Sequence, residues 1–325
     1  MKISVLITTY NNAQFILSAV YSILHQTYKD FELVIVDDGS TDNTRELINS
    51  VNDERINYHR IEHVKRSKAL NYGLGICNNE WVALMDADDI CHPRRLEIEL
   101  KALTENKGLD IISSWYAIFS SNKIHYITKT PEHNNSIKKS LLLHSVISNP
   151  GVIFRKSLIL DKGGYSSMYD DYGIEDYNLW LKLITKATFY NIQQTLIFHR
   201  YRTSSASRKN LRQTADKIYV LQMPYIKAYL NNFSDSDKNI LLGWREYFYG
   251  KKKRAWHYWK KLHLKILLRP RILAALTFLV LPEKYFTRFK ELRIRLRLNY
   301  LLTYFSKNNI ESRRFLGKIL SENYY

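Results

Sequence analysis

The first hundred residues alternate between short apolar runs and amphipathic stretches, and this alternation restricts the fold more than any other feature. Mostly apolar runs with the length of buried strands occupy residues 3–7, 31–36 and 81–85, and residues 56–61 alternate as a strand does. Between them, apolar residues recur at helical spacing over 15–24, 67–77 and 93–103. Strands that alternate with helices build a parallel sheet covered by helices, so the chain is predicted to open with an α/β fold.

The pattern changes twice further along the chain. Beyond residue 108 it is mixed, and we expect strands over 110–119, 124–128 and 146–155 and a helix over 175–186. After about residue 208 the strand patterns stop, and helices are expected over 211–230, 237–249 and 283–305. These changes predict an α/β domain at 1–208, with halves at 1–107 and 108–208, and a helical region at 209–325, the boundary falling within 204–209.

Charge and cysteine content narrow the class of protein. The chain has 325 residues and a net charge of +18, and residues 216–325 alone carry 23 Lys and Arg against 8 Asp and Glu. Cys77 and Cys91 lack the spacing of a metal site or a disulfide framework, so a reducing, cytoplasmic compartment is expected. The first apolar run is too short for a secretion signal, and the run at 272–282 is too short to span a bilayer.

Polar residues follow three of the predicted strands. The segments are Thr8-Thr9-Tyr10-Asn11, Asp37-Asp38-Gly39-Ser40 and Asp86-Ala87-Asp88-Asp89. Ligands of open parallel sheets bind beyond the carboxyl ends of the strands. Clustered carboxylates repel one another unless a cation offsets them, which suits Mg²⁺ or Mn²⁺ held by carboxylates and substrate phosphates. The sequence therefore predicts a site for a divalent cation and a diphosphate after the fourth strand.

Four motifs, in order along the first 210 residues, carry a resemblance to a known family. They are Ser4-Val5-Leu6-Ile7-Thr8-Thr9-Tyr10-Asn11; the run from Phe31 to Asp42 that contains Asp37-Asp38-Gly39-Ser40; Asp86-Ala87-Asp88-Asp89 with Pro93-x-Arg95-Leu96; and Glu175-Asp176 before Leu179-Trp180-Leu181. Together they resemble the inverting family 2 glycosyltransferases of bacterial surface polysaccharide synthesis. The resemblance implies a GT-A fold, a Rossmann-like domain with a mixed central sheet that binds nucleotide-diphosphate sugars.

The resemblance also implies roles for the residues that bind the donor, which is expected to be a UDP-sugar. Thr8, Tyr10 and Asp38 would hold the base, with Tyr10 stacking on it, while Asp37 caps the turn. Lys68 would reach the nucleotide or the diphosphate. Asp86 would contact the ribose, and Asp88 would ligate the Mn²⁺ or Mg²⁺ that bridges the phosphates. Asp89 would either assist this site or cap the helix that follows.

The expected catalytic base is Asp176, because inverting transfer needs a carboxylate that takes the proton of the acceptor hydroxyl. By resemblance, residues 1–107 would form the nucleotide-sugar-binding half and residues 108–208 the acceptor half. Glu175 would bind the acceptor or donor sugar, and Asn149 would line the acceptor side. Trp180 is predicted to be a core residue. The implied reaction moves a sugar to a saccharide or lipid-linked acceptor in the synthesis of capsule, O-antigen or lipooligosaccharide.

One segment departs from the family. Members often carry Tyr-Arg-x-His after the last strand, whereas this chain has Tyr201-Arg202-Thr203-Ser204. The histidine is missing there, and His199 could replace it only if the register of the strand shifted. A loop at 204–209 could instead close over the diphosphate through Arg208 or Lys209.

The basic tail allows three interpretations. Residues 251–261 form a basic stretch with interleaved aromatic residues, which fits a solvated helical face, a nucleic-acid site or an anionic membrane surface. No nucleic-acid-binding module accompanies it, so we expect no nucleic acid partner. Basic, Trp and Tyr side chains suit a lipid interface, which predicts peripheral attachment to the inner face of the cell membrane.

Two other functions remain open from the sequence. A sugar-phosphate nucleotidyltransferase would also use a metal-binding Asp, but residues 8–12 lack the glycine and basic side chains of its usual loop. A non-catalytic, transferase-like scaffold that binds a membrane or a partner is the third class.

Overall fold

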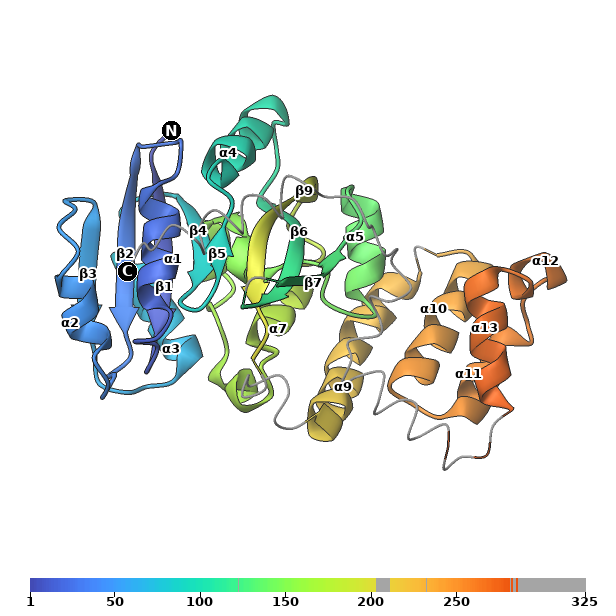
Figure 1. Ribbon diagram of the computed structural model, residues 1–325. Coiled ribbons are helices and arrows are strands. Elements are labelled where there is room, and N and C mark those ends of the chain that lie inside the picture. The colour runs from blue at the N-terminus through green and yellow to red at the C-terminus, as the bar shows by residue number, and fades with distance from the viewer. Residues whose placement is uncertain (122, 203–210, 232, 281, 283–284, 286–325) are drawn as a thin grey trace.

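A nine-stranded mixed sheet forms the centre of the part of the chain that the structure, a computed structural model, describes: residues 1–121, 123–202, 211–231, 233–280, 282 and 285 (Figure 1). The strands are β1 (Ile3–Thr9), β2 (Phe31–Asp37), β3 (Ile56–Arg60), β4 (Trp81–Asp86), β5 (Ile90–Cys91), β6 (Ile111–Ser120), β7 (Lys123–Thr128), β8 (Ile153–Arg155) and β9 (Phe189–Arg200). Their order is β3-β2-β1-β4-β8-β6-β9-β5, and β7 pairs with β6. The first four strands are parallel and β8 runs antiparallel to β4, which confirms the expected mixed sheet.

Helices cover both faces of this sheet (Figure 1). They are α1 (Ile16–Leu24), α2 (Thr44–Asn49), α3 (Arg66–Ile76), α4 (Arg95–Glu105), α5 (Asn134–Leu141), α6 (Lys156–Leu160) and α7 (Glu175–Leu183), with short 3₁₀ helices η1 (Asn149–Gly151) and η2 (Ser167–Tyr172). Alternate residues of each central strand enter different core clusters. Leu6 and Val34 belong to one, and Val5, Leu33 and Ile35 to the other. Burial on both faces explains why these strands are mostly apolar in sequence, with exceptions such as Ser4 in β1 and Glu32 in β2.

The sequence analysis was wrong about one strand and did not identify several elements. Of residues 146–155, expected as a strand, only Ile153–Arg155 form one (β8), because Pro150 has no N–H to donate to a ladder and lies in the 3₁₀ turn η1. The long strand β9, the two-residue strand β5 and helix α5 were not delimited. Apart from Tyr285, the helix expected over 283–305 lies outside the described residues, as does the loop at 204–209 with Arg208 and Lys209.

The C-terminal region is helical, as expected. It contains α9 (Leu211–Leu230), α10 (Asp235–Phe248), α11 (Lys252–Trp259), α12 (Leu264–Leu267) and α13 (Pro270–Leu279). Helix α9 joins the main core, since Leu221 and Ile226 belong to the cluster that contains Trp180. Helices α10 to α13 share a smaller core around Trp259, which is fully buried. A Cβ atom on Gly243 of α10 would lie 2.0 Å from Trp259 Nε1, so this helix contact requires glycine.

None of the helices in the described residues combines the length and the apolar character that crossing a membrane requires.

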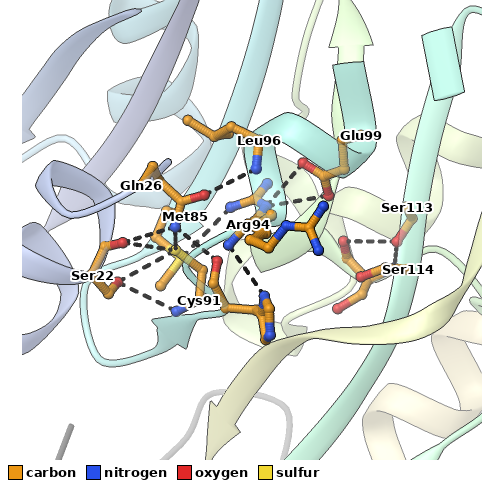
Figure 2. Close-up of polar contacts among 12 residues, drawn as sticks. Ser22, Gln26, Met85, Cys91, Arg94, Leu96, Glu99, Ser113 and Ser114 are labelled. Atoms are coloured by element: carbon orange, nitrogen blue, oxygen red, sulfur yellow. Dashed lines mark hydrogen bonds and ion pairs between the residues drawn. The ribbon is translucent and has the colours of Figure 1, made fainter. Parts of the chain in front are cut away.

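A buried polar cluster supports the turn that follows β4 (Figure 2). Gln26 donates to the backbone oxygen of His92 at 2.8 Å and accepts the N–H of Leu96 at 3.0 Å, which fixes the start of α4. Arg95 and Glu99 on α4 form an ion pair of 3.0 Å with both side chains fully buried. These contacts hold the chain segment immediately after Asp86–Asp89 in place.

Candidate active site

The three polar segments predicted from the sequence meet at the carboxyl edge of the sheet. In the register of the parallel strands, Thr8 lies beside Asp86 and Thr9 beside Asp37, because β1 is the strand between β2 and β4. The central position of β1 therefore brings together residues that are far apart in the sequence.

Asp37 and Asp38, at the end of β2, make different contacts. Asp37 accepts the N–H of Ser40 at 2.8 Å and the hydroxyl of Tyr58 at 2.7 Å, so it holds the turn. Asp38 accepts the N–H of Val64 at 2.7 Å and lies 2.9 Å from Nδ1 of His63. Asp37 therefore caps the turn, as expected, and Asp38 faces residues 63 and 64.

Tyr10 is an exposed aromatic residue rather than a core residue. Its side chain is 43% exposed and stacks on His63, with ring centroids 4.2 Å apart. The sequence analysis did not select His63, because a single histidine in a loop carries no recognisable pattern. Together Tyr10, His63 and Asp38 form a flat aromatic surface with a carboxylate at its edge.

The turn Asp86–Asp89 is bound tightly by the end of β9. Asp89 is fully buried, accepts the N–H of Arg200 at 2.8 Å and pairs with Nδ1 of His199 at 2.8 Å. Burial raises the pKa of Asp89 to about 6, although His199 opposes that rise. Asp88 pairs with Arg202 at 3.0 Å, and Arg202 also donates to Asn12 at 2.9 Å.

Three potential metal ligands lie close together where this turn meets the end of β9. One ligand atom each of Asp86, Asp89 and His199 falls within 4.8 Å of the other two. Two carboxylates and an imidazole are donors that suit Mn²⁺. The sequence analysis assigned the metal to Asp88 and gave Asp89 a secondary role, whereas Asp88 faces Arg202. His199 reaches the group because the pairing of β9 with β6 sets His199 opposite Ile118.

Arg66 connects the two halves of the site. It lies 2.7 Å from Oδ1 of Asp86 and 2.9 Å from Oε1 of Glu175. Lys68, the cation chosen from the sequence, is exposed and does not line the cavity described below. Arg66 is the first residue of α3 and follows Lys65, whose φ of 68° is rare for a residue other than glycine. A cation at a helix start after the third strand is the signal that could have identified it.

Glu175 and Asp176 open helix α7. Glu175 is buried, and burial raises its pKa while Arg66 lowers it. Its Oε2 is buried and accepts no hydrogen bond from any described residue. Asp176 Oδ1 accepts the N–H of Tyr177 at 2.6 Å. Trp180, in the same helix, is fully buried and confirms its prediction as a core residue.

A cavity of about 470 Å³ unites most of these groups. The predicted residues that line it are Asp86, Asp88, Asn149, Glu175 and Asp176. Thr8, Tyr10, Asp38, Lys68 and Asp89 are not among its lining residues. His199, Arg200 and Arg202 contribute cationic and imidazole groups. A further wall comes from Thr214, Ala215 and Ile218 on α9 and from Tyr249 after α10, none of which the sequence analysis selected.

Comparison with known proteins gives consistent results. The family model described as "Glycosyl transferase family 2" matches residues 4–160. The UDP-Gal:alpha-D-GlcNAc-diphosphoundecaprenol beta-1,3-galactosyltransferase of Escherichia coli is 34% identical over 251 residues, 74% of this chain and 89% of that protein. The O-antigen biosynthesis glycosyltransferase WbnJ of Escherichia coli is 28% identical over 238 residues, 71% of this chain and 92% of the relative.

Two solved structures share the fold. TarS 1–349 of S. aureus with UDP-GlcNAc superposes with a TM-score of 0.58 at 20% identity, covering 98% of this chain and 91% of that one. The mannosyltransferase PcManGT from Pyrobaculum calidifontis, solved with GDP-Man and Mn²⁺, gives a TM-score of 0.56 at 17% identity, with coverages of 94% and 88%.

Proposed function

The chain belongs to glycosyltransferase family 2, and we propose that it transfers a sugar, with inversion, from a UDP-sugar to a lipid-linked saccharide of a surface polysaccharide. The family membership makes it an enzyme that uses a nucleotide-sugar donor. Neither nucleotidyl transfer nor a non-catalytic scaffold fits that membership. One observation carries the proposal: Asp176 lines the same cavity as Asp86, Asp88 and Arg202.

The donor base is assigned to the surface formed by Tyr10, His63 and Asp38. An exposed aromatic ring offers a face on which a base can stack, and a carboxylate can accept a base N–H. Thr8, two residues before Tyr10, lies beside Asp86 in the sheet. This arrangement supports the expected roles of Thr8, Tyr10 and Asp38, and adds His63 as the residue that supports the ring of Tyr10.

A divalent cation fits the group formed by Asp86, Asp89 and His199, whose donor atoms lie within 4.8 Å of one another. When bound, Mn²⁺ or Mg²⁺ would neutralise the charge that develops on the leaving diphosphate. Asp88, the metal ligand expected from the sequence, lies in the same turn. It would be free to bind the cation if Arg202 left Asp88 and bound the diphosphate instead. Arg200 and Arg202 line the cavity and supply positive charge of their own.

Asp176 is assigned as the general base. It lies in the first turn of α7, where the helix dipole favours a negative charge. It takes the proton of the acceptor hydroxyl, whose oxygen forms a bond to the anomeric carbon as the bond to the diphosphate breaks. A hydroxyl of one of the sugars is assigned to Glu175, whose buried Oε2 accepts no hydrogen bond from the described residues.

Attachment to an anionic membrane surface is assigned to the C-terminal helices. The exposed apolar side chains there include Trp256 at 48%, Leu264 at 69% and Leu268 at 55% exposure. Lys260, Lys261 and Lys265 are exposed beside them. Trp259, expected at the lipid interface, is instead a core residue. The protein should float with vesicles that contain phosphatidylglycerol and not with pure phosphatidylcholine, and a Leu264→Asp, Leu268→Asp double variant should float with neither.

The function is tested in two steps. UDP-, GDP- and dTDP-sugars are screened for Mn²⁺-dependent protection against thermal unfolding, because a ligand of the native state raises the apparent stability. UDP-sugars are expected to protect. Asp176→Asn should retain this protection and lose sugar transfer, and Asp88→Asn should lose transfer as well. Asp171→Asn is the matched control, since Asp171 is exposed and pairs with the exposed Lys65. Undiminished transfer in Asp88→Asn and Asp176→Asn would refute the assignment.

A further inference from the structure

We infer that α9 and Tyr249 form the surface that binds and selects the acceptor saccharide, an inference that rests on the proposed transfer reaction. This wall lies outside residues 4–160, the segment that the family model matches. Thr214, Ala215 and Ile218 are spaced to share one face of α9, and Tyr249 joins them along the cavity.

Helix α9 is fixed directly to the helix that carries the proposed base. Gln222 is fully buried and donates from Nε2 to the backbone oxygen of Leu143 at 2.8 Å and to the hydroxyl of Tyr177 at 3.0 Å. Tyr177 follows Asp176 and donates to the backbone oxygen of Leu141 at 2.6 Å. The wall therefore has a defined position relative to the base, which selection of one acceptor hydroxyl requires.

Tyr249 is held by a second buried network, between α9 and α10. Arg245 and Glu246 form an ion pair of 3.3 Å with both side chains almost fully buried. Tyr219 of α9 donates to Glu246 at 2.7 Å, and the guanidinium of Arg245 lies 3.6 Å from the centre of the Tyr219 ring. The N–H of Tyr249 donates to the backbone oxygen of Arg245 at 2.9 Å, so its backbone is part of the ordered end of α10.

The chemistry of this wall differs from that of the rest of the cavity. It offers a hydroxyl, aliphatic groups and a phenol ring, and none of its four residues is Asp, Glu, Lys or Arg. The rest of the lining includes Asp86, Asp88, Arg66 and Arg202. A diphosphate is bound by cations and cation-holding carboxylates, whereas a sugar ring presents C–H groups to an aromatic face and hydroxyls to polar atoms. The uncharged wall therefore suits the acceptor saccharide and the charged side suits the donor.

The test compares the two substrates of the full-length enzyme. UDP release from the UDP-sugar that protects best in the thermal unfolding screen is measured without acceptor and with a panel of synthetic acceptors, the undecyl diphosphates of glucose, galactose, GlcNAc and GalNAc. Tyr249→Ala and Ile218→Asn are expected to raise the KM for the accepted probe by about 10-fold or more and to leave the donor KM and acceptor-free UDP release unchanged. Tyr249→Phe, which keeps the ring, should remain close to the wild type.

The matched control is Val220→Asn, because Val220 lies on α9 two residues from Ile218 and is 69% exposed. It should change neither KM. An unchanged acceptor KM in Tyr249→Ala and Ile218→Asn would overturn the inference, as would an equal rise in the donor KM. A wild-type enzyme that releases UDP with no member of the panel above the acceptor-free rate would instead refute the proposed function, and the inference with it.

Discussion

Nε of Arg66 lies 2.9 Å from Oε1 of Glu175, the residue that precedes the proposed base. The same guanidinium lies 2.7 Å from Oδ1 of Asp86. One side chain thus ties the carboxylate turn after β4 to the start of α7. Because a guanidinium offers donors in a rigid planar fork, it can hold two carboxylates at once in a way that an ammonium cannot.

Replacement of Arg66 should therefore damage catalysis. We expect Arg66→Lys to lower kcat/KM by about 100-fold, which corresponds to about 2.7 kcal/mol, because two carboxylates of the cavity lose their shared partner. Lys68→Ala serves as the control, since Lys68 is exposed and outside the cavity lining. Steady-state kinetics of UDP release measure both. A larger loss in Lys68→Ala than in Arg66→Lys would restore Lys68 as the cation that contacts the donor.

Loss of His199 should weaken the response to metal. If His199 completes the group with Asp86 and Asp89, His199→Ala should raise the Mn²⁺ concentration for half-maximal activity by about 10- to 100-fold. Chelation of divalent cations by EDTA should abolish wild-type activity, and added Mn²⁺ should restore it. His125→Ala provides a histidine control on β7. An unchanged Mn²⁺ titration in His199→Ala would remove this histidine from the site.

The contact between α10 and α11 allows a prediction about stability. Gly243→Ala should lower the free energy of unfolding by about 1–3 kcal/mol, because the new methyl group would overlap Trp259 and force a shift. Gly75→Ala is the matched control in α3, where nothing lies within 4 Å of the added Cβ. That change should be neutral or stabilising by up to about 1 kcal/mol. Urea denaturation followed by circular dichroism measures both, and equal stabilities of the two variants would contradict the tight contact.

The buried Arg95–Glu99 pair predicts a pH dependence of stability. Burial raises the pKa of Glu99 from 4.5 to about 7, while Arg95 opposes the rise. A group with a raised pKa in the folded state binds its proton more tightly there, so its contribution is complete below pH 4.5 and is lost as the pH rises through about 7. The free energy of unfolding of the wild type should decline over this range.

Glu99→Gln should flatten that decline, because glutamine does not titrate. The comparison uses the slope against pH rather than the absolute stability, so a general loss of stability does not obscure it. Glu97→Gln is the control: salt bridging to Arg94 and a hydrogen bond from Thr27 lower the pKa of the exposed Glu97 to about 2. Its contribution changes only in acid, and the slope between pH 5 and 7 should match the wild type, whereas an unaltered slope in Glu99→Gln would contradict the assignment.

The α/β order and the approach of the polar segments followed from the sequence because both depend on local pattern. Buried strands such as β1 and β2 are mostly apolar, and polar residues that follow parallel strands must share one edge of the sheet. The C-terminal helices α9 and α10 were also predictable, since their apolar residues recur at helical spacing.

Contacts that depend on how distant segments pack were not predictable. Arg66 reaches Glu175 across more than one hundred residues, and its position at the start of α3 does not reveal that contact. His199 precedes the position at which the family's Tyr-Arg-x-His segment carries its histidine. The pairing of β9 with β6 nevertheless brings His199 to Asp89. Pro150 shortened a predicted strand because a missing N–H outweighs the apolar character of its neighbours.

The packing of α9 affects how this enzyme can be cut or recombined. Leu221 and Ile226 belong to the core that contains Trp180, and Gln222 bonds to Tyr177 beside the proposed base. A shortened protein that ends near residue 208 would expose this apolar surface and is expected to aggregate when it is expressed. Chimaeras that exchange the C-terminal region should therefore take α9 and its partners on α7 from the same protein. Otherwise α7, which carries the proposed base, would lose the contacts that position it.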